Sequence, residues 1–288
     1  MDTNMTLLQL LQRPEIVIAP GAYDALTARL VEQAGFPAVY MTGAGTSAAL
    51  GYPDYGLVTM TEMVDNAGRM ARSVGLPLIA DADTGYGNEL NVIRTVREFE
   101  SRGVSAIHIE DQVSPKRCGH LDGKAVIRRE DFVSKIRAAV SARRSADFLI
   151  IARTDARAVV SFQEAVDRAN LALAAGADMV FIEATQTLEE VAAVPRLVSG
   201  PCMLNVVPGG KTPALRMDEA QAMGYRLAIF PVLLFKAVVE VCDEALAAVK
   251  ATQLSPAGRD TKIHDLFRRA GADEWDAQRD QFKSFEIL

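Results

Sequence analysis

Short runs of apolar, often β-branched residues alternate with longer amphipathic stretches along the whole 288-residue chain. This alternation is typical of repeated strand–helix units around a parallel sheet. The centres of the apolar runs are almost wholly hydrophobic, as expected of strands covered on both faces. Eight strands are predicted, at Glu15–Ala19, Ala38–Thr42, Leu78–Ala82, Ala106–Glu110, Leu149–Arg153, Val180–Ala184, Cys202–Val206 and Leu227–Pro231.

Stretches with helical periodicity lie between these strands. They include Ala22–Ala34, Thr59–Val74, Leu90–Arg102, Glu130–Arg143 and Phe162–Ala175. Eight such units predict a single-domain (β/α)₈ TIM barrel over residues 1–288, with its active-site groups on the loops at the carboxyl ends of the strands. Residues 251–288 form a predicted helical extension outside the eight units. This extension either packs over the barrel or reaches a neighbouring subunit.

Charge and hydropathy exclude several classes of partner. Lys and Arg number 31 against 37 Asp and Glu, which gives a net charge of −6, and the sequence has no basic stripe. A nucleic acid or an anionic membrane is therefore not an expected partner, and small molecules are favoured. The longest strongly apolar run, residues 227–235, contains a proline and is far shorter than the roughly 20 residues of a membrane span. With no signal-peptide pattern at the N-terminus, a cytoplasmic location is expected.

Polar residues follow five consecutive predicted strands. They are Asp81 and Asp83 after the third, His108 and Glu110 at the end of the fourth, Arg153 at the fifth, Glu183 at the sixth and Asn205 at the seventh. In a barrel these side chains converge on one mouth. Three carboxylates gathered there would repel one another without a cation or protons between them. Oxygen-only ligands suit Mg²⁺ or Mn²⁺, so a water-rich magnesium site is predicted.

The loop after the fourth strand, residues 111–124, is long and contains glycines at 119 and 123. We expect the part from Gln112 to Lys124 to be mobile and to close over substrate. Cys118 lies in this loop among basic residues, a setting predicted to favour the thiolate and a role in proton transfer or nucleophilic attack. The other two cysteines, Cys202 and Cys242, are predicted to be small buried hydrophobic residues.

Two glycine-rich stretches resemble phosphate-binding loops. Gly210-Lys-Thr212 lacks the glycine that a Walker A loop needs five residues earlier, where Asn205 stands. Gly43-Ala-Gly-Thr-Ser-Ala48 fits a dinucleotide fingerprint, but no acidic residue ends a second strand about 20 residues later. Its glycines are instead predicted to let backbone N–H groups approach a substrate carboxylate.

Four motifs together resemble the isocitrate lyase and phosphoenolpyruvate mutase superfamily: Asp81-Ala-Asp83, His108-Ile-Glu110, Lys116-Arg-Cys-Gly-His120 and Ala152-Arg-Thr-Asp155. The resemblance extends from about Pro14 to Lys250. The Lys-Arg-Cys-Gly-His motif marks the carbon–carbon lyases of that superfamily, and the chain length is like that of its short members, methylisocitrate lyase and dimethylmalate lyase. The segment Gly209–Pro213 is similar to that of dimethylmalate lyase, oxaloacetate acetylhydrolase and carboxyphosphonoenolpyruvate mutase.

The resemblance implies a role for each matching residue. Asp81 would bind Mg²⁺ (or Mn²⁺) most directly, and Asp54, Asp83 and Glu110 would hold its waters. Cys118 would be the general acid/base, in a catalytic set with Lys116, His120 and Arg153. The implied substrate-binding residues are Tyr40, Thr42, Gly43, Ala44, His108, Arg153, Glu183 and Asn205. The resemblance also implies a homotetramer, a dimer of dimers that exchange the eighth helix.

The expected activity is that of a Mg²⁺-dependent carbon–carbon lyase. It would cleave a substituted malate, like 2,3-dimethylmalate or 2-methylisocitrate, to pyruvate or glyoxylate and a carboxylic acid. Three alternatives remain open: a carboxyphosphonoenolpyruvate-type phosphonomutase, an oxaloacetate hydrolase or decarboxylase, and a catalytically idle barrel that binds a dicarboxylate.

Overall fold

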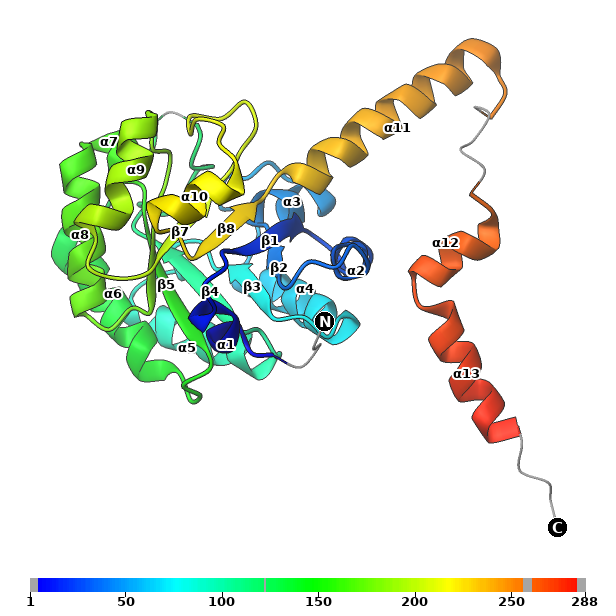
Figure 1. Ribbon diagram of the computed structural model, residues 1–288, viewed down its shortest axis with the longest axis horizontal. Helices are drawn as coiled ribbons and strands as arrows, with labels where there is room; N and C mark the ends of the chain where they lie inside the picture. The colour runs from blue at the N-terminus through cyan, green and yellow to red at the C-terminus, as the bar shows by residue number, and fades with distance from the viewer. Residues whose placement is uncertain (1–4, 122, 256–260, 284–288) are drawn as a thin grey trace. The chain divides into compact units, whose positions relative to one another are not determined.

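Eight parallel strands close into a barrel in the computed structural model, which describes residues 5–121, 123–255 and 261–283. Neighbouring strands pair in chain order, and β8 pairs back onto β1 (Figure 1). The predicted (β/α)₈ TIM barrel is confirmed. The strands are β1 (Val17–Ala22), β2 (Val39–Met41), β3 (Leu78–Asp81), β4 (Ala106–Glu110), β5 (Leu149–Thr154), β6 (Met179–Ile182), β7 (Cys202–Asn205) and β8 (Leu227–Phe230).

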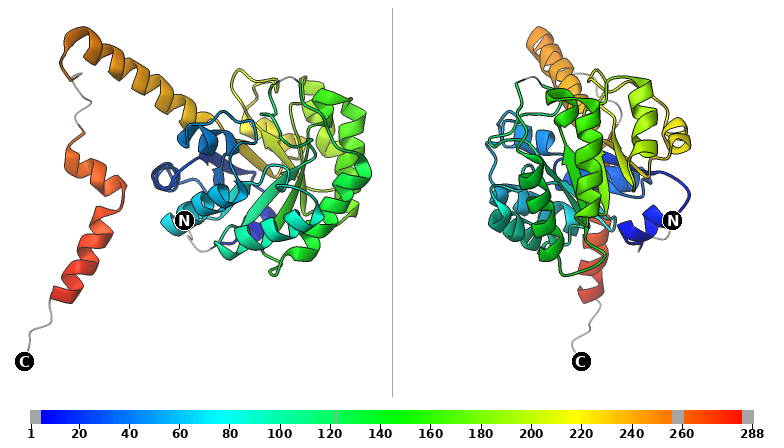
Figure 2. Two further views of the ribbon diagram at one scale, coloured as in Figure 1. Left: turned by 180° about the vertical axis from the view of Figure 1, so that it is seen from behind. Right: turned by 90° about the vertical axis from the view of Figure 1, so that its left-hand side faces the viewer.

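Helices surround this barrel on its outer side (Figure 2). Most begin at a side chain that caps free backbone N–H groups, as Thr59 does for Glu62 at the start of α4. They are α2 (Ala25–Gln33), α3 (Gly43–Ala49), α4 (Met60–Ser73), α5 (Glu89–Ser101), α6 (Arg129–Ala142), α7 (Ala156–Val159), α8 (Phe162–Ala174), α9 (Leu188–Leu197) and α10 (Met217–Met223). The predicted helices match α2, α4, α5, α6 and α8 to within three residues at each end.

Two predicted elements near the N-terminus differ from the structure. The first strand was expected at Glu15–Ala19, but β1 continues through Pro20 and Gly21 to Ala22. A Cβ at Gly21 would lie 2.5 Å from the carbonyl oxygen of Pro231, so the glycine allows the close approach of the chain that follows β8. The stretch from Gly43, expected as a loop, is the short helix α3, which Thr42 caps.

A short helix before β1, α1 (Leu7–Gln12), closes the N-terminal end of the barrel. Leu7 and Leu10 are buried against the inward side chains at the starts of the strands. Arg226 binds the segment after α1, because its guanidinium donates to the carbonyl oxygens of Leu11, at 2.7 Å, and Pro14, at 3.1 Å. These contacts cover the N-terminal end of the barrel, which leaves the carboxyl ends of the strands as its other open face.

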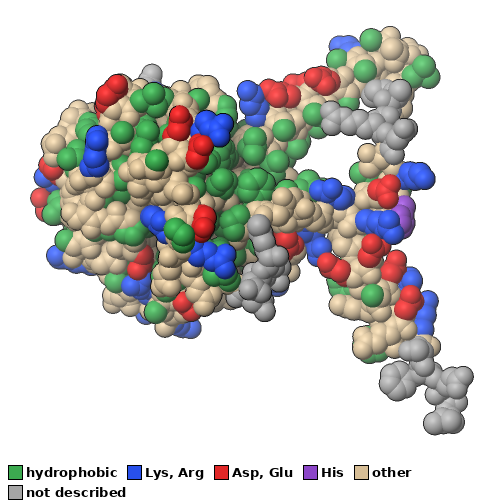
Figure 3. All heavy atoms as spheres, in the orientation of Figure 1, with side chains coloured by type: hydrophobic (Ala, Val, Ile, Leu, Met, Phe, Trp, Pro, Cys, Tyr) green, Lys and Arg blue, Asp and Glu red, His purple; other side chains and the backbone are tan. Residues whose placement is uncertain are grey.

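Residues 236–288 form a second unit, distinct from the compact unit of residues 1–235. It contains most of α11 (Leu233–Thr252), together with α12 (Ile263–Arg269) and α13 (Ala272–Lys283). The helical extension predicted for 251–288 is confirmed for α12 and α13, whereas 256–260 and 284–288 lie outside the described residues. No residue of these three helices is buried, and apolar side chains lie among charged ones along them (Figure 3).

Cys242 lies on α11 and is exposed, so the prediction that it is a buried hydrophobic residue is wrong. The prediction relied on the apolar helical sequence around Cys242, but no residue of α11 is buried. Cys202 on β7 is buried, as predicted. None of the described helices is long and apolar enough to cross a membrane.

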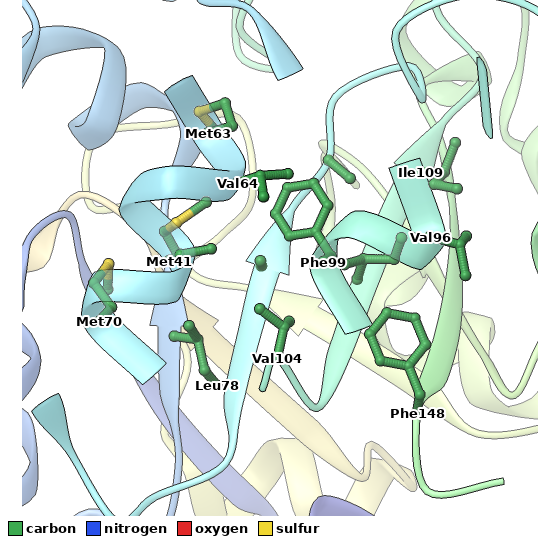
Figure 4. Packing of buried hydrophobic residues seen from close by; sticks show 14 of the residues in the cluster. Met41, Met63, Val64, Met70, Leu78, Val96, Phe99, Val104, Ile109 and Phe148 are labelled. Atoms are coloured by element: carbon green, nitrogen blue, oxygen red, sulfur yellow. The ribbon is translucent and has the colours of Figure 1, made fainter. Parts of the chain in front are cut away.

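Side chains of each strand alternate between two hydrophobic layers. One layer fills the barrel interior, and the other lies between the strands and the helices, where Met63 and Phe99 pack (Figure 4). In β4, Ala106 faces the interior, whereas Ile107 and Ile109 belong to the outer layer. Because side chains alternate with a period of two residues, His108 and Glu110 share the inward face with Ala106.

Candidate active site

The side chains that point into the barrel are polar where the strands reach its carboxyl end. Asp81 on β3 is paired with His108 on β4, and Glu110 on β4 is paired with Arg153 on β5. From β3 to β7, apolar residues fill the lower inward positions and polar residues the last ones, as Ile151 and Arg153 do on β5. The polar residues predicted from five strand ends therefore meet at one mouth.

A cavity of about 90 Å³ lies at this mouth. Most of the predicted site residues line it: Tyr40, Thr42, Ala44, Asp54, Asp81, Cys118, His120, Arg153, Glu183 and Asn205. The other predicted residues lie directly behind this wall. A Cβ at Gly43 would contact Asp81, Lys116 binds Asp83, His108 binds Tyr40, and Glu110 pairs with Arg153.

Sequence reasoning missed the apolar part of the lining. Gly119, Phe181, Val207, Pro231 and Val232 complete the cavity wall. Phe181 occupies an inward position on β6, and Val207 occupies the next inward position after β7. Following the period-two pattern along β6 and past the end of β7 would have found both residues. The wall is thus divided between charged groups and a small apolar patch.

Two larger cavities, of about 290 and 440 Å³, lie at the opposite end of the barrel beside α1. Leu76 and Pro77, which precede β3, line both of them. Neither contains any of the predicted site residues. Size therefore does not identify the site in this molecule, and the concentration of buried charged groups does.

Arg153 is the central cation of the site. Its guanidinium lies 3.1 Å from a Glu110 carboxylate oxygen, 3.0 Å from Asp155 and 3.3 Å from Glu183. It also lies over the ring of Phe181, 5.2 Å from its centroid. These contacts fix the guanidinium in a buried position beside the cavity.

Lys116 is a second buried cation, at the start of the long loop. Its ammonium binds the carboxylates of Asp54 and Asp83, with Nζ 2.9 Å from the Asp83 Oδ1. Burial disfavours the charged amine, but the nearby Asp83 and Asp54 outweigh this and raise the pKa of Lys116 well above its usual value. The loop is therefore held to the barrel by charge.

The carboxylates at the mouth differ in their affinity for protons. Burial raises the pKa of Asp83 to about 6, and burial likewise raises the pKa of Glu110 well above its usual value. Asp81 is also buried, but His108, which is protonated in the acidic range where Asp81 titrates, lowers the pKa of Asp81 to about 2 together with Lys116 and Arg153. Asp81 is thus the carboxylate that stays ionised most readily.

His108 and Tyr40 form a buried pair beside Asp81. The Tyr40 hydroxyl lies 2.8 Å from His108 Nε2, which is 3.6 Å from Asp81 Oδ1. Burial lowers the pKa of His108 to about 4, so the imidazole is neutral near pH 7. A neutral ring beside Asp81 leaves the carboxylate available for another cation.

The donor set fits a water-rich magnesium site. Glu110 Oε1 is buried without a hydrogen-bond partner among the described residues, so this oxygen can accept a hydrogen bond from a metal-bound water. Within residues 5–121, 123–255 and 261–283, no three His, Cys, Asp or Glu side chains lie close enough together to ligate one ion. Mg²⁺ keeps several waters and commonly uses one or two carboxylates, so direct binding by Asp81 alone is compatible with this geometry.

The Cys118 loop lies over the cavity. The backbone N–H of Cys118 donates to the Asp54 carbonyl at 3.1 Å, and the amide of Gln112 forms two hydrogen bonds with the backbone of Arg117. His120 accepts a hydrogen bond from the Lys211 N–H and lies 3.3 Å from a Glu183 oxygen. The structure thus shows the loop in place, and the mobility expected for it stays a prediction, with residue 122 outside the described part of the chain.

The prediction that basic neighbours favour the Cys118 thiolate is wrong. Burial, and next the charge of Asp54, raise the pKa of the Cys118 thiol. Lys116 binds Asp54 and Asp83, and Arg117 lies over the ring of Tyr55, so both are directed elsewhere. Residues adjacent in the sequence therefore do not set the charge around this sulfur.

A model of the phosphoenolpyruvate phosphomutase family matches residues 7–250. The chain belongs to this family. The family assignment confirms the superfamily expected from the sequence motifs. Among curated members, the chain is similar to 2,3-dimethylmalate lyase of Eubacterium barkeri, with 44% identity over 91% of each chain. It is likewise 44% identical to 2-methylisocitrate lyase of Aeropyrum pernix, over 99% of this chain and 93% of that enzyme.

Solved structures of the phosphoenolpyruvate phosphomutase family agree with this similarity. Oxaloacetate acetylhydrolase with 3,3-difluorooxalacetate superposes with a TM-score of 0.94 at 36% identity, over 99% of this chain and 98% of that one. 2,3-Dimethylmalate lyase gives 0.91 at 39% identity, over 97% and 96%. Phosphonopyruvate hydrolase with oxalate and Mg²⁺ gives 0.85 at 31% identity, over 96% and 98%.

A second group of buried charged residues lies behind the wall of the cavity. Asp111 accepts hydrogen bonds from the Thr154 hydroxyl at 2.6 Å and the Asp155 N–H at 2.8 Å, and it pairs with Arg168. Lys124 pairs with Asp155 at 2.6 Å. Asp155 stands two residues after Arg153, where the inward register continues, which is a signal that sequence reasoning could have used.

Proposed function

We propose that this protein is a Mg²⁺-dependent carbon–carbon lyase that cleaves a substituted malate to a 2-oxo acid and a second carboxylic acid. The observation that carries this proposal is the meeting of Cys118, Arg153 and Asp81 in one cavity. Cleavage needs an anion-binding cation, a group that can hold a metal, and a proton donor for the carbanion. The relatives named 2,3-dimethylmalate lyase and 2-methylisocitrate lyase support the same reaction class.

Arg153 binds the carboxylate next to the carbinol carbon of the substrate. The start of α3, with Gly43 and Ala44, lies on the same side of the cavity as Asp81 and offers backbone N–H groups to that carboxylate. Glu110, Asp155 and Glu183 hold the guanidinium in place before substrate arrives. This preorganisation favours the charge that develops on the 2-oxo acid.

Cys118 donates the proton that completes cleavage. When the C2–C3 bond of the malate breaks, water takes up the proton of the 2-hydroxyl, C2 becomes a carbonyl carbon and the electron pair stays on C3; water later returns a proton to the thiolate that Cys118 becomes. The thiol transfers its proton to C3 and gives the free carboxylic acid. A thiol that burial keeps protonated is in the form that a general acid needs.

Asp81 would hold Mg²⁺ directly, and Asp54, Asp83 and Glu110 would bind its waters. When bound, the ion supplies Lewis-acid polarisation of the oxygen on C2. Mn²⁺ fits the same oxygen donors. A related protein, phosphonopyruvate hydrolase, has been solved with oxalate and Mg²⁺, which supports a magnesium site in this family.

The cavity favours a small dicarboxylate with alkyl substituents. Among the described residues that line it, only Arg153 and His120 are basic, and Phe181, Val207, Pro231 and Val232 form an apolar patch. Methyl groups suit such a patch, whereas the third carboxylate of 2-methylisocitrate would need another cation. We therefore propose 2,3-dimethylmalate, cleaved to pyruvate and propionate, as the representative substrate.

We further propose that the helices after the barrel complete a homotetramer by packing on neighbouring subunits. Large apolar side chains on them are exposed in the single chain, including Val241, Leu246, Leu266, Phe267, Trp275 and Phe282. An apolar surface of this extent is typical of an oligomer interface.

The test is a panel of acids assayed for pyruvate and glyoxylate release with Mg²⁺: 2,3-dimethylmalate, 2-methylisocitrate, isocitrate and oxaloacetate. We expect rapid pyruvate release from 2,3-dimethylmalate, loss of that activity with EDTA, and recovery with Mg²⁺ or Mn²⁺. Turnover of none of the malates, or full activity in EDTA, would contradict the proposal.

A further inference from the structure

We propose that Lys124 is a positioning residue that links closure of the Cys118 loop to the orientation of Arg153. The inference rests on the proposed lyase function, in which Arg153 binds the substrate carboxylate and Cys118 supplies the proton. Lys124 does not line the cavity. It acts on both groups through the residues between them.

The ammonium group of Lys124 is buried and has two partners. Its side chain is 1% exposed, and Nζ lies 2.6 Å from Asp155 Oδ1, a carboxylate with no exposed surface. Nζ also donates to the carbonyl oxygen of Gly119. A buried ammonium is costly unless it is paired, so this position is favourable only while both partners are present. Since Gly119 belongs to the loop and Asp155 follows β5, moving the loop away would break this arrangement.

Asp155 connects Lys124 to Arg153. Its Oδ2 accepts a hydrogen bond from Arg153 Nε at 3.0 Å, and its own N–H donates to Asp111 at 2.8 Å. Three carboxylates thus surround the single positive charge of Arg153: Glu110, Asp155 and Glu183. Lys124 adds a second positive charge. Without it, Asp155 would draw the guanidinium more strongly, away from the substrate side.

Gly119 connects Lys124 to the loop residue that reacts. A Cβ at Gly119 would lie 2.5 Å from Arg153 Nη2 and 2.6 Å from Glu183 Cγ, so its backbone rests directly on the guanidinium. Cys118 is the preceding residue. By holding the Gly119 carbonyl, Lys124 fixes the Cys118 segment against Arg153. Lys124 therefore acts on both groups in the contact between the Gly119 backbone and the Arg153 guanidinium.

Three variants separate positioning from simple stabilisation. Lys124→Met keeps most of the side-chain length and removes the charge, and Lys124→Arg restores a positive donor. The matched control is Arg143→Met, which removes the ion pair with Asp178 at the other end of the barrel. Each is compared with wild type for kcat and KM on 2,3-dimethylmalate, for affinity for oxalate with MgCl₂, for thermal unfolding, and for tryptic cleavage after Arg117.

For Lys124→Met we expect KM to rise, kcat to fall, and kcat/KM to fall by about 10–100-fold, the range for groups that orient a catalytic residue. Cleavage after Arg117 should be roughly tenfold faster than in wild type even without ligand, because it follows the population of the open loop. Lys124→Arg should recover most of both properties. Arg143→Met should lower the unfolding temperature and leave kinetics, oxalate affinity and cleavage unchanged.

Wild-type kinetics and wild-type cleavage after Arg117 in Lys124→Met, with only a lower unfolding temperature, would overturn the inference. This test of Lys124 does not depend on whether the proposed lyase function is correct. If wild type cleaves none of the malates, the lyase proposal fails, whereas cleavage after Arg117 without ligand still decides whether Lys124 holds the loop.

Discussion

Ionisable side chains are buried at the mouth of the barrel, whereas large apolar side chains are exposed along α11, α12 and α13. His108, Glu110 and Asp155 are each 0% exposed, while Leu246 is 68% and Trp275 69% exposed. Both regions depart from ordinary burial, in opposite directions. Both regions fit the proposals made above, in which a ligand brings charge to the mouth and neighbouring subunits cover the helices.

The largest effect should come from the mouth. Cys118→Ser should lower kcat on 2,3-dimethylmalate by about 10²–10⁴-fold, the contribution of a general acid, because a hydroxyl is a far weaker acid than a thiol. Steady-state kinetics would measure the loss, and thermal unfolding would confirm the fold.

Cys242→Ser on exposed α11 is the matched control and should keep wild-type kcat. Equal losses in the two variants would remove the contrast between a cysteine in the site and one outside it. Turnover of Cys118→Ser within a few-fold of wild type would contradict the proposed mechanism.

The next effect concerns the stability of the charged layer behind the mouth. Arg168→Met should lower the free energy of unfolding by about 3–5 kcal/mol, because it leaves Asp111 buried without its cation. Urea unfolding would measure the change. Arg279→Met on α13 removes a pair whose side chains are about half exposed and should have almost no effect. A similar small change in both variants would show that burial does not strengthen the Arg168–Asp111 pair.

The smallest effect should come from the exposed apolar helices. Leu246→Glu should weaken self-association by roughly 10–100-fold, equivalent to losing one buried leucine from an interface, while the barrel stays folded. Light scattering during size-exclusion chromatography would report the mass as a function of concentration. Leu90→Glu on α5 is the control, since Leu90 is 73% exposed on a barrel helix. A monomeric wild-type chain would disprove the proposal that neighbouring subunits cover α11, α12 and α13.

Much of the barrel follows from local pattern. β4 lies at Ala106–Glu110 as predicted, because its apolar run and its flanking residues leave little freedom in the register. The error at β1 arose because Pro20 and Gly21 resemble a strand terminus, although the glycine is needed for contact with the chain after β8. That contact joins residues more than 200 positions apart, and no local signal contains it.

The site was predictable where strand ends define it and not where loops do. Asp81, Glu110 and Arg153 meet as expected because the inward register determines their direction. The charge around Cys118 was predicted wrongly, since Asp54, distant in sequence, contacts the loop while the adjacent basic residues point elsewhere. Lys124 was overlooked for the same reason: its partner Asp155 follows a different strand.

The alternation along β4 separates what this protein does from what keeps it folded. Ile107 and Ile109 pack in the outer layer between strand and helices, while His108 and Glu110, between and after them, point inward behind the wall of the cavity. A change at the last inward position of a strand alters the site without changing the outer packing layer. The same scaffold can therefore acquire new substrates by substitution at these last inward positions, and a library confined to them should yield folded proteins of altered specificity far more often than one spread along whole strands.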